Sequence, residues 1–116
     1  MRNSVFDPMM GSIERYMDLL SARQKLVASN IANVDTPGYK TKDIDFQFEF
    51  MSLMKDENPN VVEAPGLTVH NDGNNVNLDR EARLLMENDM RFNVASNLMR
   101  SQFRTLHLAI DEGKTS

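Results

Sequence analysis

Hydrophobic side chains recur at alternating spacings of four and three residues in two long stretches, one toward each end of the chain. In the first stretch the recurring positions are Ile13, Met17, Leu20, Gln24, Val27, Ile31 and Val34. This spacing is typical of an α-helix that packs along a narrow seam against another helix, and only Gln24 departs from it in polarity. Asp7 followed by Pro8 favours a helix start, because proline is tolerated in the first helical position. We therefore predict an N-terminal helix over residues 7–34.

The second stretch begins after Asn77 or Asp79, either of which can cap a helix, and it reaches Gly113, a residue type that often ends one. Its recurring positions are Leu85, Asp89, Phe92, Ser96, Met99, Phe103, Leu106 and Ile110. This pattern predicts a C-terminal helix over residues 78–112, which is longer than an average globular helix. Asp89 is the charged exception in this seam. The two stretches together predict a mainly α-helical protein whose terminal helices pair as an antiparallel, coiled-coil-like hairpin.

Each predicted helix carries a second apolar row that a two-helix hairpin leaves uncovered. These rows are Leu19, Ala22 and Leu26 in the N-terminal helix and Met86, Met90, Val94 and Leu98 in the C-terminal helix. Either the middle of the chain folds over the rows, or neighbouring subunits cover them. We favour neighbouring subunits because the middle is polar, and we expect the isolated chain to be only partly ordered at both ends.

Residues 35–77 are predicted to form an irregular middle. Apolar residues alternate as in a strand at Ile44, Phe46, Phe48 and Phe50, and they share one helical face at Phe46, Phe50, Leu53 and Met54. Of these two patterns we favour the short helix, within residues 43–54. Residues 55–66 contain two prolines and predict a flexible loop. Residues 67–78 predict a small β-hairpin whose turn is residues 71–74.

Composition limits the functions open to the chain. Its 116 residues fit one domain, residues 1–116, with a modest core. The 13 basic residues are scattered singly and 17 acidic residues outnumber them, which argues against binding nucleic acid. There is no cysteine, and no apolar stretch approaches the ~20 residues of a membrane span. The first residues also lack the pattern of a cleaved secretory signal.

Few groups are available for catalysis or metal binding. The two histidines, His70 and His107, lie on different predicted elements without a carboxylate at a metal-ligand spacing. The run from Asp72 superficially resembles a calcium loop, but its sixth position is Asn77 and its twelfth is Arg83, where glycine and glutamate are needed. We predict no catalytic, cofactor-binding or metal-binding residue and no enzymatic activity.

Two motifs carry a resemblance to a known family. The first runs from Ser21 to Lys40 and contains Asn30-Ile31-Ala32-Asn33 and Thr36-Pro37-Gly38-Tyr39; the second comprises Lys42-Asp43-Ile44-Asp45-Phe46 and the run from Asp72 to Glu81. With these motifs the chain resembles the bacterial flagellar basal-body rod proteins, and among them the subunits of the proximal rod. The resemblance spans roughly residues 12–112.

The resemblance implies a structural subunit of the proximal rod that associates with copies of itself and with other rod proteins to transmit torque. It also implies contacts with the proteins of the junction between the MS ring and the rod, and with the flagellar export apparatus. The implied location is the periplasmic rod of the basal body, reached by type III export without a cleaved signal peptide.

The first motif also supplies the expected subunit-contact residues, which are Asn30, Asn33, Thr36, Pro37, Gly38 and Tyr39. Pro37 disfavours helix at the residue before it, and Gly38 permits the positive φ of a turn, so the first helix is predicted to end near Val34. The amides of Asn30 and Asn33 can satisfy the helix end itself or form hydrogen bonds across a repeating subunit contact. The resemblance favours the second interpretation.

A soluble helical-hairpin adaptor or export chaperone that binds one cytoplasmic partner is the alternative function. Helical periodicity is equally compatible with both. The turn from Thr36 to Tyr39, directly after the asparagine cluster, favours the rod subunit because such an adaptor has no evident need for it.

Overall fold

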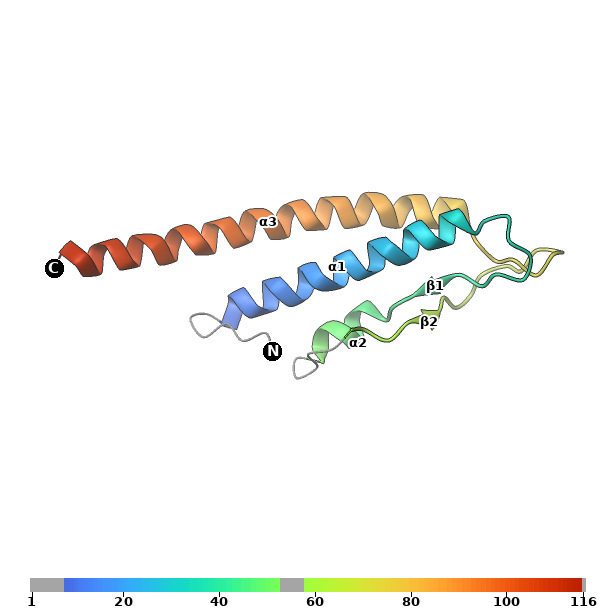
Figure 1. The fold of residues 1–116 in the computed structure, drawn as a ribbon, viewed down its shortest axis with the longest axis horizontal. Coiled ribbons are helices and arrows are strands. Elements are labelled where there is room, and N and C mark those ends of the chain that lie inside the picture. Colours follow the sequence, from blue (N-terminus) through green and yellow to red (C-terminus); the bar gives the residue numbers. More distant parts are fainter. Residues whose placement is uncertain (1–7, 53–57, 116) are drawn as a thin grey trace.

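The computed structural model describes residues 8–52 and 58–115 and is elongated, 71 × 26 × 18 Å (Figure 1). In chain order its elements are α1 (Pro8–Ala32), β1 (Lys42–Asp43), α2 (Phe46–Met51), β2 (Val62–Glu63) and α3 (Leu78–Thr115). The predicted fold class is confirmed, since the protein is mainly helical, with paired terminal helices, a short middle helix and a small antiparallel sheet.

Helix α1 begins at Pro8, and the Asp7 cap predicted for it lies outside the described residues. The helix ends at Ala32, two residues before the predicted end. The amide of Val34 bonds to the carbonyl of Ile31, three residues back, so the last turn tightens before the chain leaves the helix. Gly38 then adopts a φ of 76°, the positive value expected after the stop.

Helix α3 is longer than predicted. Its start is capped by Asn77, whose side-chain oxygen accepts a hydrogen bond from the amide of Arg80 at 3.1 Å. Its 38 residues continue to Thr115, so the prediction that Gly113 ends the helix is wrong. A glycine that ends a helix commonly adopts a positive φ. Among the described residues, the glycines with a positive φ are Gly38, Gly66 and Gly73, and Gly113 is not one of them.

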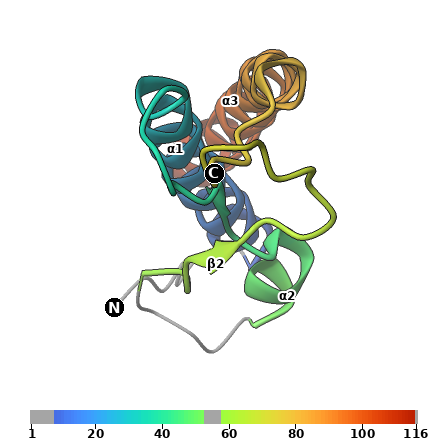
Figure 2. The ribbon, with the colours of Figure 1, turned by 90° about the vertical axis from the view of Figure 1, so that its right-hand side faces the viewer.

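The two long helices run antiparallel and in contact along α1 (Figures 1 and 2). Asn30 bonds to Glu81, and Asn88 bonds to the carbonyl of Leu20, which sets the register between the helices. In this register the start of α1 lies beside residue 103. Residues 103–113 of α3, which we call the α3 overhang, therefore extend past the first described residue of α1.

The predicted short helix is confirmed as α2, and the competing strand interpretation is wrong. Asp45 caps α2 by accepting a hydrogen bond from the amide of Phe48. The rings of Phe46 and Phe50 pack edge-on against Tyr16 of α1, with centroids 5.4 and 5.8 Å apart. These aromatic contacts fix the helical phase, because residues four apart share one face of a helix.

The small antiparallel sheet is not where the sequence predicted it. Strand β1 pairs with β2, with Lys42 opposite Glu63, so one strand comes from the segment predicted as a flexible loop; residues 55–57 of that segment, and residues 53 and 54 of the predicted short helix, lie outside the described residues. The predicted turn at residues 71–74 does form, with Gly73 at a φ of 86°. Its flanking residues form no strands: one backbone bond crosses the turn, from the amide of His70 to the carbonyl of Asn74 at 2.8 Å, while the next residue, Asn75, bonds to Tyr39 and Thr41.

The middle of the chain packs against α1 and leaves most of α3 uncovered (Figures 1 and 2). The second apolar row of α1 is accordingly covered: Leu19 is buried, and Ala22 and Leu26 are half-buried. The second row of α3 is exposed, and its members Met86, Met90, Val94 and Leu98 are 71, 68, 68 and 43% accessible. The middle of the chain therefore covers the second row of α1, whereas the described residues leave the second row of α3 exposed.

Candidate functional site

A cluster of polar side chains joins the end of α1, strand β1 and the start of α3. We call it the polar hub; its members are Arg23, Asn30, Asp43, Arg80 and Glu81. Asn30 and Glu81 are fully buried, and Asp43 is 6% exposed. Polar groups buried to this degree must be paired, and the hub does this with partners from three different segments.

Asn30 uses its whole amide within the chain. Its nitrogen donates to the carbonyl of Lys42 at 2.9 Å and to a carboxylate oxygen of Glu81 at 2.7 Å. Its oxygen accepts from the amide of Lys42 at 3.0 Å and from the hydroxyl of Tyr39 at 2.9 Å. An asparagine side chain has two donors and an acceptor oxygen with two lone pairs, so no capacity remains for a further partner.

The charged members of the hub form a continuous chain of ion pairs. The guanidinium of Arg80 bridges two carboxylates, those of Glu81 at 2.6 Å and Asp43. Asp43 also accepts from Arg23 at 2.9 Å and from the amide of Ile44 at 2.7 Å. Two arginines thus face two carboxylates, which balances the charge inside the cluster.

The environment of Asp43 favours its ionised form. Burial alone would raise the pKa of this carboxyl group, but the hydrogen bonds from Arg23 and Ile44 and the charges of Arg23 and Arg80 outweigh it. The pKa of Asp43 therefore lies below its ordinary value. The carboxylate stays charged, and the two arginines stay paired, throughout the neutral pH range.

A second set of amides fastens the turn after α1 to the turn before α3. Asn74 donates to the carbonyls of Asn33 and Thr36 at 2.8 and 2.9 Å. Asn75 accepts from the amide of Thr41 at 2.6 Å, and the amide of Gly38 donates to the carbonyl of Asp72. Residues 33–41 and 72–75, which lie far apart in the sequence, are therefore in direct contact.

Asn30, predicted as a subunit contact, is buried and fully paired inside its own chain. Asn33 is half-buried and makes local bonds, donating to the carbonyl of Ser29 and accepting from the hydroxyl of Thr36. Thr36, Pro37 and Gly38 are exposed. Sequence reasoning missed Arg23, Asp43, Arg80 and Glu81, although all four lie within the two motifs.

The predicted seam residues of α1 mostly face the interior. Ile13, Leu20 and Val27 are buried, Met17 and Val34 are half-buried, and Ile31 is 37% exposed. Gln24, the polar member, is exposed and accepts a hydrogen bond from Asn88 of α3 at 3.2 Å. The polar break in the apolar pattern thus has a polar partner on the opposite helix.

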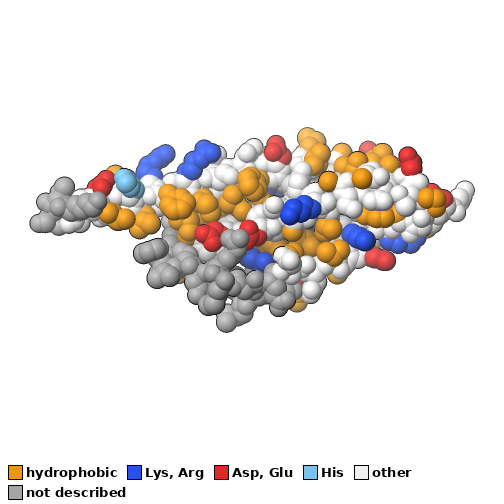
Figure 3. Space-filling model, in the orientation of Figure 1, with side chains coloured by type: hydrophobic (Ala, Val, Ile, Leu, Met, Phe, Trp, Pro, Cys, Tyr) orange, Lys and Arg blue, Asp and Glu red, His pale blue; other side chains and the backbone are white. Residues whose placement is uncertain are grey.

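The predicted seam of α3 is not the row that the single chain buries. Leu85, Phe92, Phe103 and Ile110 are 38, 41, 55 and 48% exposed, and Met99 and Leu106 are half-buried. The buried residues of α3 are Glu81, Asn88 and Ala95. Two causes explain the difference: α1 contacts a row of small and polar side chains beside the apolar one, and the α3 overhang has no part of α1 opposite it. Figure 3 shows hydrophobic side chains recurring along the molecule as a result.

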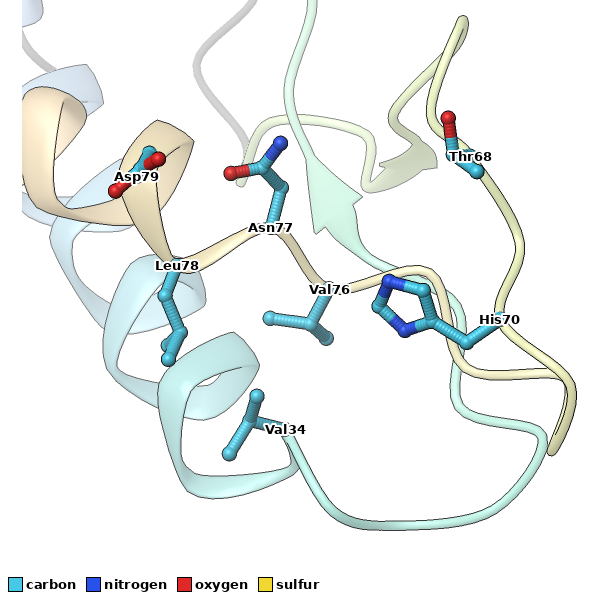
Figure 4. A pocket seen from close by; sticks show the side chains of 7 residues that line it. All are labelled: Val34, Thr68, His70, Val76, Asn77, Leu78 and Asp79. Carbon is cyan, nitrogen blue, oxygen red and sulfur yellow. The ribbon is translucent and has the colours of Figure 1, made fainter.

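Two of the concave regions on the surface of the described residues bear on function. One, of about 340 Å³, lies next to the polar hub, where Val34, Val76 and Leu78 form an apolar floor and His70 and Asp79 stand at the edge (Figure 4). The other is a larger groove of about 520 Å³ between α1, α2 and α3. Its lining is almost entirely apolar, which suits a protein side chain or helix better than a charged small molecule.

The geometry offers little for catalysis. Within residues 8–52 and 58–115, no three His, Asp or Glu side chains gather as a metal site would require. His70 lines the smaller pocket, whereas His107 lies in the exposed overhang, 3.7 Å from Asp111. None of the described helices combines the length and the apolar character needed to cross a membrane.

Comparison with known proteins gives a consistent result. Residues 17–40, which contain the first motif, match the family model described as flagella basal body rod protein. A flagellar basal body rod protein FlgB of Borrelia hermsii is 30% identical, over 92% of this chain and 98% of the relative. The FlgB proteins of Bacillus subtilis and Escherichia coli are 27 and 28% identical, over 96 and 84% of this chain and 99 and 88% of theirs.

Proposed function

The chain belongs to the FlgB family of flagellar basal body rod proteins, and on that premise we propose that it is a structural subunit of the proximal rod. In this role it associates with copies of itself and with other rod proteins. The assembled subunits transmit torque, and the chain itself has no enzymatic activity.

The exposed apolar surface of α3 is the observation that carries this proposal. Nine large apolar side chains of this helix are at least 41% accessible, namely Leu78, Met86, Met90, Phe92, Val94, Leu98, Phe103, Leu108 and Ile110. Soluble monomers rarely expose apolar side chains in such continuous rows, and rows of this kind mark protein contacts. Covering these rows between subunits stabilises an assembly by about 25 cal/mol per Å² of apolar surface buried, before the entropy cost of ordering the subunits is subtracted.

The shape of the molecule suits a tubular assembly. A rigid helix of 38 residues, about 57 Å long, can carry a load along its axis. Contacts between unlike surfaces build open helical arrays when the rotation from one subunit to the next does not close a ring. Subunits joined in this way along a shaft pass rotation from one to the next.

The location and the remaining partners follow from the same premise. We place the chain in the periplasmic part of the basal body, next to the proteins that join the MS ring to the rod. It reaches that place through the flagellar export apparatus, without a cleaved signal peptide. A chain whose apolar rows are covered only after assembly is suited to passage in an unfolded state, because its core is small before partners arrive.

The exposed turn of Thr36, Pro37 and Gly38 is a second candidate contact surface. Asn74 holds the turn by donating to the carbonyls of Asn33 and Thr36, and Asn30 of the polar hub accepts from the hydroxyl of Tyr39 directly after it. A rigid, exposed turn of small residues permits close approach of a neighbouring backbone. Its role in subunit contact is part of the proposal.

Replacement of apolar residues in a complemented strain tests the function. The variant Met86→Ser with Leu108→Ser alters two residues of α3 that are 71 and 58% exposed, so the fold of the monomer is retained. The matched control, Val61→Ser with Val69→Ser, alters two residues of the middle that are each 54% exposed. We expect the α3 variant to be lost from purified basal bodies and swimming to fail, whereas the control behaves as wild type.

The same strain separates the rod subunit from the alternative, a soluble helical-hairpin adaptor or export chaperone. A rod subunit co-purifies with basal bodies after membrane extraction. Recovery of the wild-type chain only in the cytoplasmic fraction, bound to one partner, would establish the adaptor and overturn the proposal.

A further inference from the structure

The groove between α1, α2 and α3 is an apolar surface without cover in the described chain. It is lined by Ile13 and Tyr16 of α1, Phe50 of α2 and Val94 and Leu98 of α3, and its volume is about 520 Å³. Val94 is 68% exposed there. Of the described residues that line the groove, Arg91 is the one with a charge.

The α3 overhang has the complementary character. Phe103, Leu106 and Ile110 lie within roughly 60° of arc around the helix, at 100° per residue, and form one apolar stripe. Asp111 directly follows this stripe and is exposed. His107 lies 3.7 Å away on the same helix, and the carboxylate of Asp111 remains on the surface.

The two surfaces match in length. The groove is lined by α3 from Met90 to Leu98, about 12 Å along the helix. The apolar stripe of the overhang runs from Phe103 to Ile110, about 11 Å. The overhang and the groove wall belong to one continuous helix, so the overhang of a chain cannot bend back into the groove of the same chain.

We propose that the groove binds the α3 overhang of a second copy of this chain, with Arg91 of one copy facing Asp111 of the other. This inference rests on the self-association proposed above and specifies its surfaces. The contact joins unlike surfaces, so every copy in a row has one groove and one overhang engaged with different neighbours. When the rotation from one copy to the next does not close a ring, the result is an open row of subunits.

Disulfide cross-linking tests which surfaces meet. The chain has no cysteine, so an introduced thiol is the only one present. A mixture of Val94→Cys and Ile110→Cys chains is expected to give a cross-linked dimer on mild oxidation. The control mixture pairs Ile110→Cys with Asn93→Cys, an exposed residue of the same helix outside the groove lining. Equal yields from the two mixtures, or a dominant dimer of Val94→Cys with itself, would overturn the inference.

Charge reversal supplies a second test. Arg91→Glu is expected to weaken self-association at least about fivefold, and Asp111→Arg in the same chain is expected to restore it. Both residues are exposed, so the monomer keeps its fold. A double variant no stronger than Arg91→Glu alone contradicts the pairing.

Sedimentation velocity of the wild-type chain separates the two levels of the proposal. If the wild type associates but the Val94→Cys and Ile110→Cys chains do not cross-link, the chain self-associates through other surfaces and the inference is refuted. A chain that stays monomeric at all concentrations would refute both. A cross-link from Val94→Cys to a different rod protein in purified basal bodies, with none to a second copy, would assign the groove to that protein and refute the inference.

Discussion

Replacing Asn30 with aspartate changes one atom group in the centre of the polar hub. The side chain keeps its shape, but an amide nitrogen that donates to Glu81 at 2.7 Å and to the carbonyl of Lys42 at 2.9 Å becomes a carboxylate oxygen. Two donated hydrogen bonds are lost, and two carboxylates come into contact at a site from which solvent is excluded. We therefore expect Asn30→Asp to be more destabilising than the larger truncation Asn30→Ala.

The magnitude follows from the contacts. Asn30→Ala leaves the buried partners of the amide unpaired, at about 1–3 kcal/mol for each group that water cannot reach, or about 2–4 kcal/mol in total after relaxation. Asn30→Asp adds repulsion between like charges, about 4 kcal/mol for charges about 4 Å apart at an effective dielectric constant of 20. Small domains have unfolding free energies of about 5–15 kcal/mol, so the aspartate variant is close to unfolded at neutral pH.

Urea denaturation followed by circular dichroism at 222 nm measures these differences. The control is Asn33→Ala, because the side chain of Asn33 makes only local bonds and is half-buried, so a loss below about 1 kcal/mol is expected. Lowering the pH toward about 5 should restore part of the stability of Asn30→Asp, since protonation of one of the two facing carboxylates removes the repulsion between them. Equal stability of Asn30→Asp and Asn30→Ala at pH 7 would refute the assigned direction of the Asn30 amide.

Three further outcomes are expected. Asp43→Asn leaves Arg23 and Arg80 without their shared carboxylate and should lower the unfolding free energy by about 3 kcal/mol in urea melts. Because the pKa of Asp43 is lowered from 3.8, its contribution to wild-type stability is present above about pH 4 and is lost as the pH falls through the lower pKa of the folded state. Melts between pH 6 and about pH 3 should therefore fall less steeply for Asp43→Asn than for wild type, and parallel curves would contradict this account. Gly73→Ala should destabilise by about 1–3 kcal/mol, since φ is 86° and the added Cβ would lie 3.3 Å from the Cα of Gly38. Gly113 lies inside α3 with open space around it, so Gly113→Ala should instead stabilise the helix by up to about 1 kcal/mol in thermal melts. A lower stability of Gly113→Ala would contradict this expectation.

The parts of the fold that depend on long-period patterns could be predicted from the sequence. The four-and-three spacing located both long helices, and Pro37 with Gly38 marked the end of the first to within two residues. The aromatic residues of α2 gave the correct helical face because Phe46 and Phe50 are one turn apart. These signals are local, so they can be read from the sequence without knowledge of the tertiary partners.

The buried row of α3 could not be predicted, because it contains Glu81, Asn88 and Ala95, residues that a search for apolar seams passes over. Glu81 is buried only because Asn30 and Arg80 pair with both oxygens of its carboxylate, and Asn30 is 51 residues away. Strands β1 and β2 are two residues each, too short to show any period. The arginines and carboxylates of the hub stood inside the motifs, but only the structure brings them together.

The order in which the hub residues leave the ribosome has a consequence for the cell. Asn30 is synthesised early, whereas its carboxylate partner Glu81 belongs to the last third of the chain. Throughout most of translation, the nascent polypeptide contains the amide without the group that completes its bonding. A factor that must capture the chain before it folds therefore has nearly the whole period of synthesis in which to do so.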